Sequence, residues 1–363
     1  MRSGQPRLHG LAAARSAAVQ SEIIIILQRV SDNAARTFDR CASAGRGAMF
    51  ETHLGWKGIF QTLSNFLFAE DVFAMTKSAT GIRAVYTARA DAGQAKAIAA
   101  TASPFTIEVR FLGGLTEVQQ AAFTQAADRW VRVIVGDLPE VEIDGDVIDD
   151  VLILAQGVRI DGPGRILGQA GPTHIRTAGS GASAFLPAKG AMSFDTDDLE
   201  KMEEEGTLDD VITHEMGHVL GVGGQLWSRK ELLADEDSDN PTFTGRAAKQ
   251  EYGRLRDGRP RAVPVENTGG AGTRGSHWRE TVFRNELMSG FIAAKNNPLS
   301  RVTVASLQDL GYEVDMGAAE AYTLPNLLEL AEEGTLVPHA APVDLGIMLP
   351  TVPMELPAES LRR

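Results

Sequence analysis

Apolar residues in the middle of the chain follow strand and helix periods in turn. Residues 105–112 (FTIEVRFL) alternate apolar and polar positions, which predicts a half-buried strand. Thr116 and Gln119 form a capping box before a run with helical spacing, which predicts a long helix. The apolar runs at 151–155 and 191–195 predict two further strands. Strands, a helix and more strands together indicate an α+β fold.

A second helical pattern follows these strands. Thr207 stands at its start with Asp210 behind it, so we expect Thr207 to cap the helix. Its apolar arc consists of Leu208, Val211, Ile212 and Val219. Glu215 lies inside this arc, where a carboxylate is costly to bury unless it is paired or functional. Gly221 is expected to turn the chain at the helix end, because glycine tolerates the left-handed conformation.

The chain after this helix shows weaker patterns. Residues 225–276 are polar and glycine-rich, which predicts a long loop region. Ser300 is expected to cap a last helix, with Leu307 among its inward residues and Gly311 at its end. From about Pro338 the tail is rich in proline and leucine and follows neither a helical nor a strand period.

Composition and charge narrow the class of protein. With 363 residues, 43% of them hydrophobic, the chain can bury a sizeable core. A net charge of -13 and scattered basic residues argue against binding to nucleic acid or anionic membranes. The apolar run 23–27 is too short for a signal-peptide core or a transmembrane segment. Cys41 is the single cysteine, which excludes an intramolecular disulfide and leaves the compartment open.

The second helix carries the pattern His-Glu-x-x-His at His214, Glu215 and His218. Residues four apart lie on the same face of a helix, so the two imidazoles can bind one metal ion. Glu215 is placed to take a proton from a metal-bound water. The alternative is an ordinary amphipathic helix with incidental histidines, and the acid inside the apolar arc counts against it.

A catalytic zinc ion generally takes three protein ligands, so a third ligand is needed. The commonest continuation of the motif has a histidine where this chain has Gly224. We favour His277, because it follows a glycine-rich loop that can fold back and precedes Met288 by eleven residues. The alternative is a carboxylate between Glu231 and Asp239, as in zinc peptidases with an acidic third ligand.

The ordered segments HEMGHVLGVG, SHWRE, NELMSGF and LSRVTVASLQDLGY resemble the leishmanolysin family of metzincin zinc peptidases. The resemblance covers about residues 105–312, with an interruption of about sixty residues between the first two segments. It implies zinc on His214, His218 and His277, Glu215 as general base, Gly221 as the turning residue and Met288 as the floor of the site.

The same resemblance implies a metzincin-like catalytic domain of the α+β class. A mixed twisted sheet and the active-site helix would form an N-terminal lobe at 101–224, and a mostly irregular or helical lobe with the methionine turn would span 225–337. Residues 1–100 would be an N-terminal extension, either propeptide-like or the product of a mis-set start codon. Residues 338–363 would be a tail rich in proline and leucine.

The implied activity is that of a zinc-dependent endopeptidase acting on a polypeptide in extended form. RIDGPGRILGQAGP and MSFDTDD are similar to the edge-strand region and the pre-helix strand of matrixin-type peptidases, where the edge strand aligns a substrate by backbone pairing. The alternatives are a thermolysin-like peptidase and a noncatalytic zinc-binding protein of the same fold, which would have no use for Glu215. Family members suggest an extracellular location, and the sequence sets no oligomeric state.

Two further features accompany the resemblance. Asp161, Asp195, Asp197 and Asp198 could hold a structural calcium ion, although solvated loop acids are the favoured interpretation. Cys41 could block the zinc as a propeptide cysteine, but its context Asp-Arg-Cys-Ala is a poor match, and an idle thiol is favoured.

Overall fold

The computed structural model describes residues 81–160, 162, 164, 167–270, 272–293, 296–326 and 352–362. All of them belong to one unit, residues 65–363. The expectations for residues 1–80, with Cys41, and for Asp161 lie outside the described residues.

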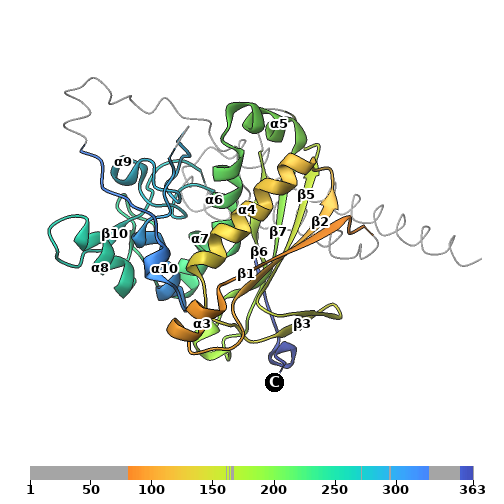
Figure 1. The fold of residues 1–363 in the computed structure, drawn as a ribbon. Helices are drawn as coiled ribbons and strands as arrows, with labels where there is room; N and C mark the ends of the chain where they lie inside the picture. Colours follow the sequence, from red (N-terminus) through yellow and green to blue (C-terminus); the bar gives the residue numbers. More distant parts are fainter. Residues whose placement is uncertain are drawn as a thin grey trace, which may run out of the picture. The chain divides into compact units, whose positions relative to one another are not determined.

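A mixed six-stranded sheet is the centre of the fold (Figure 1). Its strands, in spatial order, are β1 (Ala84–Arg89), β2 (Thr106–Gly113), β5 (Val151–Val158), β7 (Pro187–Asp195), β6 (Gly168–Ile175) and β11 (Met354–Glu355). The three strands β2, β5 and β7 are parallel, whereas β1 and β6 run antiparallel to their neighbours β2 and β7. The predicted α+β class with a mixed sheet is therefore confirmed.

The strands follow the predicted apolar patterns. In β2 the side chains of Ile107, Val109 and Phe111 are buried on the face that meets the helices. The first five residues of β5 are all buried, as expected for a central strand. The strand predicted at 191–195 begins earlier, at Pro187, where Lys189 interrupts the apolar run although it is buried.

Two long helices lie side by side on one face of the sheet (Figure 1). The first, α4 (Glu117–Val133), begins at the predicted capping box of Thr116 and Gln119. The second, α6 (Leu208–Val219), follows α5 (Thr196–Glu205) and carries the His-Glu-x-x-His pattern. The indole Nε1 of Trp130 in α4 donates a hydrogen bond of 2.9 Å to the carbonyl oxygen of Thr213, which joins the two helices.

The ends of α6 differ in how well they were predicted. Thr207 occupies the N-cap position, but its side chain makes no capping hydrogen bond, because its backbone is already near-helical with φ -102° and ψ -8°. Gly221 follows the C-cap residue with a φ of 101°, the left-handed conformation that was expected there.

The region predicted as a long loop contains short regular elements, so that prediction was wrong in part. They are α7 (Gly224–Arg229), β8 (Leu233–Ala234), β9 (Thr242–Phe243), α8 (Arg246–Arg254) and β10 (Val263–Pro264). The three strands form a small sheet in the order β10-β9-β8. Strands of two residues are too short to show a period of two, which explains why they were missed.

The last part of the fold returns to the predicted pattern. Helix α10 (Arg301–Leu310) begins with Ser300, whose side chain accepts a hydrogen bond from Thr303 N, and ends at Gly311 with a φ of 114°. The remaining elements are α3 (Ala92–Ile98), β3 (Val141–Ile143), β4 (Asp146–Ile148), α9 (Glu280–Phe283) and the 3-10 turns η1 (Gly181–Ser183), η2 (Met316–Ala318) and η3 (Ala358–Ser360).

Strands near both ends of the described residues join the sheet. Strand β1 pairs with β2 along its whole length, so the sheet begins before residue 100. Strand β11 pairs with β6, and Leu356 beside it is buried, so the tail ends in a segment attached to the sheet.

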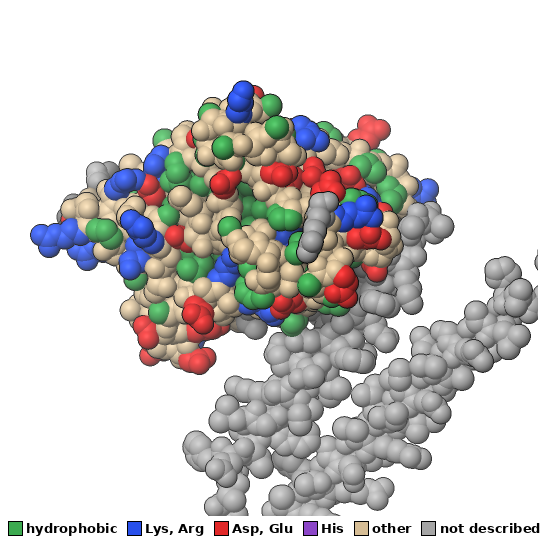
Figure 2. Space-filling view, turned by 90° about the horizontal axis from the view of Figure 1, so that it is seen from below, with side chains coloured by type: hydrophobic (Ala, Val, Ile, Leu, Met, Phe, Trp, Pro, Cys, Tyr) green, Lys and Arg blue, Asp and Glu red, His purple; other side chains and the backbone are tan. Residues whose placement is uncertain are grey.

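The surface shows mixed charge. On the face in Figure 2, both acidic and basic side chains are exposed among apolar side chains and backbone. No described helix is long and apolar enough to cross a membrane.

Candidate metal centre

Helix α6 and a distant loop bring three histidines together. His214 and His218 stand one turn apart on α6, and His277 arrives from the loop between β10 and α9. His214 and His277 are buried, while His218 is partly exposed. Their Nε2 atoms lie 3.1 Å apart for His214 and His218, 3.1 Å for His214 and His277, and 3.0 Å for His218 and His277.

Each imidazole is oriented by a backbone carbonyl group on its other nitrogen. The acceptors of the Nδ1 atoms are Leu287 O for His214 (2.6 Å), Val222 O for His218 (2.8 Å) and Thr273 O for His277 (3.0 Å). A carbonyl oxygen can only accept, so each Nδ1 carries the proton and donates it. Each neutral ring therefore presents the bare lone pair of Nε2 to the other two rings.

Three bare acceptors at this distance cannot hydrogen-bond to one another, because none of them carries a proton. Ligand nitrogens around a tetrahedral zinc ion lie about 3.3 Å apart, given a Zn–N bond of about 2.0–2.1 Å. The observed separations of 3.0 to 3.1 Å are close to that value. The donor set fits zinc in both atom type and spacing.

The buried position of the cluster keeps the imidazoles neutral. Burial lowers the pKa of His218 to about 3 and that of His277 to about 4. Burial, together with the two neighbouring histidines, lowers the pKa of His214 well below its usual value. Neutral imidazole is the form that binds metal ions.

Glu215 lies beside the cluster on the same helix and is only 1% exposed. Its Oε2 atom is buried and has no hydrogen-bond partner within the part of the chain that the structure describes. Burial raises the pKa of Glu215 to about 8. An unpartnered buried carboxyl group is costly to the fold, and this one directly follows His214 in α6.

Met288 is fully buried and packs against α6. A β-carbon built on Gly217, between the two histidines of α6, would lie 2.8 Å from Sδ of Met288. The carbonyl oxygen of Met288 accepts a hydrogen bond of 2.9 Å from Trp278 N, next to His277. Met288 thus contacts both α6, which carries His214 and His218, and the loop that carries His277.

The turn after α6 depends on its glycines. A β-carbon on Gly221 would lie 2.6 Å from Leu226, and one on Gly223 would lie 2.2 Å from the carbonyl oxygen of Ser276. The second contact is with the loop that carries His277. Gly223 therefore makes room for that loop, a role that sequence reasoning missed.

The alternative acidic ligands lie elsewhere. No carboxylate of residues 231–239 joins the ligand atoms around His214 and His218. Among the described residues, the other close group of ligating side chains is Asp137, Asp149 and Asp150. Asp150 already accepts hydrogen bonds from Leu138 N and Thr106 N, each of 2.7 Å.

The proposed calcium ligands are not all solvated loop acids, as favoured above. Asp195 is fully buried and caps α5, and it also accepts hydrogen bonds from Ile160 N and Gly162 N. Asp198 is 1% exposed and accepts a hydrogen bond of 2.8 Å from Gly164 N. Backbone N–H groups of the 160–164 segment thus meet these two carboxylates.

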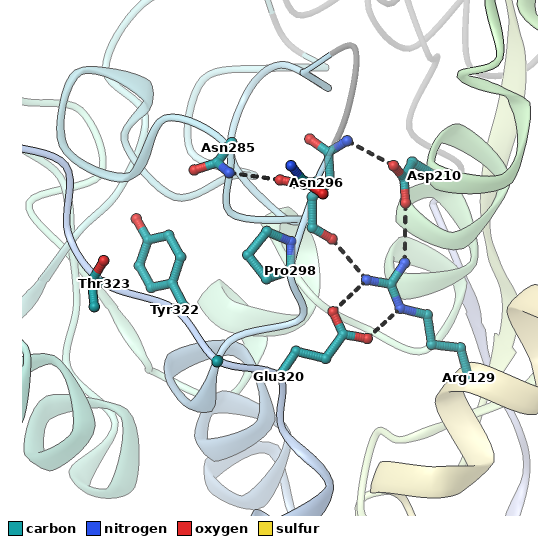
Figure 3. A pocket seen from close by; sticks show the side chains of 10 residues that line it. Arg129, Asp210, Asn285, Asn296, Pro298, Glu320, Tyr322 and Thr323 are labelled. Atoms are coloured by element: carbon teal, nitrogen blue, oxygen red, sulfur yellow. Dashed lines mark hydrogen bonds and ion pairs between the residues drawn. The ribbon is translucent and has the colours of Figure 1, made fainter. Parts of the chain in front are cut away.

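A cavity of about 600 Å³ near the start of α6 is separate from the histidines (Figure 3). Arg129 points into it and donates hydrogen bonds to Glu320, to Asp210 in the first turn of α6, and to the carbonyl oxygen of Asn297. Asn297 in turn donates to Asp210 over 2.7 Å. This network links α4 to the start of α6, and nothing in the local sequence pattern indicates it.

Comparison with known proteins supports the resemblance seen in the sequence. Residues 182–329 match the family model described as Leishmanolysin. The chain is 32% identical over 121 residues to leishmanolysin from Leishmania major, which covers 30% of this chain and 19% of that protein. The corresponding protein from Leishmania tropica is 30% identical over 121 residues, with 30% and 18% covered. The chain therefore spans about a fifth of the length of these curated relatives.

Proposed function

We propose that this chain, whose residues 182–329 make it leishmanolysin-like, is a zinc-dependent endopeptidase. The observation that carries the proposal is the convergence of three unprotonated Nε2 atoms beside the unpartnered carboxyl group of Glu215. His214, His218 and His277 would hold the zinc ion. The ion would supply Lewis acidity, which activates water and polarises a peptide carbonyl group.

Glu215 would act as the general base. Its carboxylate would accept a proton from the attacking water and then pass it to the leaving amine of the cleaved peptide bond. Met288 would form the apolar floor of the site through its contact with Gly217, and Gly221 would turn the chain away from it. These roles would correspond to a metzincin-like arrangement, in which the histidines would lie between two lobes.

A polypeptide substrate would bind in extended form along the first part of β6, before His174, because β11 already pairs with His174 and Ile175. This strand lies next to the end of α6, because a β-carbon on Gly190 of β7 would meet both Val219 of α6 and the carbonyl oxygen of Gly171 in β6. An extended chain beside the histidines could therefore pair with β6 through its backbone.

Zinc content and casein cleavage of the full chain test this function. We expect Glu215→Ala to keep zinc and lose cleavage by roughly 10²–10⁴-fold, the usual contribution of a general base. His277→Ala should lose most of its zinc affinity. The matched control is Glu236→Ala, from the alternative acidic ligand region, which should keep both zinc and cleavage.

Three outcomes would overturn the proposal or a part of it. Wild-type protein that binds zinc but cleaves no protein or peptide would be a noncatalytic zinc-binding protein. Undiminished cleavage in the Glu215 variant would show that Glu215 is not the general base. Full zinc affinity in the His277 variant, with loss of zinc affinity in the Glu236 variant, would show that the third ligand is an acidic residue.

A further inference from the structure

Glu286 is a fully buried carboxylate two residues before Met288 and outside the histidine cluster. Its Oε2 atom accepts a hydrogen bond of 2.6 Å from Met288 N. Its Oε1 atom accepts hydrogen bonds from Ser300 N (3.1 Å), Ser300 Oγ (2.7 Å) and Thr303 Oγ1. One carboxylate therefore joins the methionine turn to the first turn of α10.

The bond to Met288 N acts on the same peptide group that orients His214. The N–H of Met288 and the C=O of Leu287 belong to one planar trans peptide and point in opposite directions. Glu286 holds the N–H end, and His214 Nδ1 donates to the C=O end over 2.6 Å. Accepting from this N–H also polarises the peptide, which makes Leu287 O a stronger acceptor for His214.

A second branch leads from Glu286 towards His277. Thr303 Oγ1 donates to Glu286 and accepts a hydrogen bond of 2.7 Å from Trp278 Nε1. The backbone N of Trp278 donates to the carbonyl oxygen of Met288. Trp278 is fully buried and directly follows His277. Its side chain and its backbone N–H thus bond to Thr303 and Met288, the two residues that donate to Glu286.

We propose that Glu286 is a positioning residue of the metal centre, which orients His214 through the Leu287–Met288 peptide and His277 through Thr303 and Trp278. The inference rests on the proposed function only in taking these histidines as metal ligands. Outer groups that orient ligating histidines typically change metal affinity by about 10–100-fold when they are replaced.

The test is Glu286→Gln in the full chain. A glutamine side chain keeps the shape but has one acceptor oxygen, so it cannot accept from both Met288 N and the Ser300–Thr303 group. We expect the dissociation constant for zinc, measured by competition with a chelator, to rise about 10–100-fold. The visible absorption of the cobalt-substituted protein should also change, because it reports the ligand geometry.

The matched control is Ser300→Ala, which removes one donor and the α10 cap but keeps the bond between Glu286 and Met288. It should lower the thermal midpoint of the metal-free protein and leave the zinc dissociation constant within about twofold, because the Leu287–Met288 peptide stays held. Should Glu286→Gln not fold, Glu286→Asp, which keeps the charge on a shorter stem, takes its place with the same expected results.

The inference is overturned if the Glu286 variant loses thermal stability as the Ser300 variant does while its zinc affinity and cobalt spectrum match those of wild type. Glu286 would then only support the fold. A wild-type protein that binds no zinc would instead contradict the proposed function, so the two failures are distinguishable.

Discussion

Gly217 and Met288 meet without a side chain between them. A β-carbon on Gly217 would lie 2.8 Å from Sδ of Met288 and 2.8 Å from Cζ2 of Trp130. Met288 and Trp130 are both fully buried, so neither can move into solvent. The backbone of α6 therefore contacts Met288 directly, at a position between His214 and His218.

We predict that Gly217→Ala destabilises the protein and weakens zinc binding. Overpacking a close-packed core costs about 1–3 kcal/mol, more than the roughly 1 kcal/mol that alanine gains over glycine within a helix. Urea denaturation of the metal-free protein and zinc titration would measure the two effects. Gly179→Ala is the control, because a β-carbon there has no neighbour within 4 Å. Equal stability of the two variants would show that the core under α6 can give way.

The elements predicted correctly are those whose signals are local. The capping box at Thr116 and the cap at Ser300 each begin a helix where the sequence places it. Strand β11 was missed because its two residues pair with β6, which lies far away in the sequence. Pairing between strands that are distant in the sequence produces no periodic pattern of apolar residues in so short a segment.

The candidate site was predictable only in part for the same reason. The spacing of His214 and His218 within one helix is a local feature, and the choice of His277 relied on a resemblance as well as on the loop before it. The carbonyl groups of Leu287, Val222 and Thr273 that orient the rings belong to the backbone. Any residue type can supply such a group, so no sequence pattern reveals it.

We predict that Asp150 makes stability fall as the pH rises towards neutrality. Burial raises the pKa of Asp150 from 3.8 to about 7. Because the folded value lies above the unfolded one, the contribution of the protonated group is fully present below pH 3.8 and is lost as the pH rises through 7. The free energy of unfolding of wild type relative to Asp150→Asn should fall across this window, by at most about 1.4 kcal/mol per pH unit. Urea denaturation of both proteins from acid to neutral pH would measure it, and a flat difference would contradict it.

We predict that Arg129→Met loosens the start of the metal helix. The Arg129 side chain is 17% exposed and pairs with Asp210 and Glu320, so its removal leaves two partly buried carboxylates without their cation (Figure 3). The partial exposure reduces the cost of a broken buried pair to about 2 kcal/mol. Thermal and urea denaturation would measure the loss. Arg132→Met, at an exposed position of the same helix, should stay within about 0.5 kcal/mol of wild type, and equal losses in both variants would argue against the network.

Residues 352–362 are attached through β11 and through their end, where Leu361 forms a bridge with Val141 and Arg362 N donates a hydrogen bond of 2.9 Å to Glu140 O. Leu356 N donates a hydrogen bond of 2.9 Å to Ile175 O, and the Leu356 side chain is 6% exposed. The Glu355 carboxylate accepts hydrogen bonds from Ala178 N and from Arg229, where both partners of the ion pair are 37% exposed. Such an exposed pair contributes at most about 1 kcal/mol, so burial of Leu356 should dominate the attachment.

We therefore predict that Leu356→Asp releases residues 352–362 while the rest of the sheet stays folded. Burying an aspartate among the apolar residues that β3, β4 and β5 contribute around Leu356 is costly, and detaching the short β11 segment is the cheapest way to avoid it. Hydrogen–deuterium exchange should show faster exchange in peptides from this segment and unchanged exchange in β2 and β5. Met354→Asp is the matched control, because Met354 is 54% exposed and its replacement should keep the protection. Faster exchange throughout the central strands of the Leu356 variant would mean that the segment is required for the sheet itself.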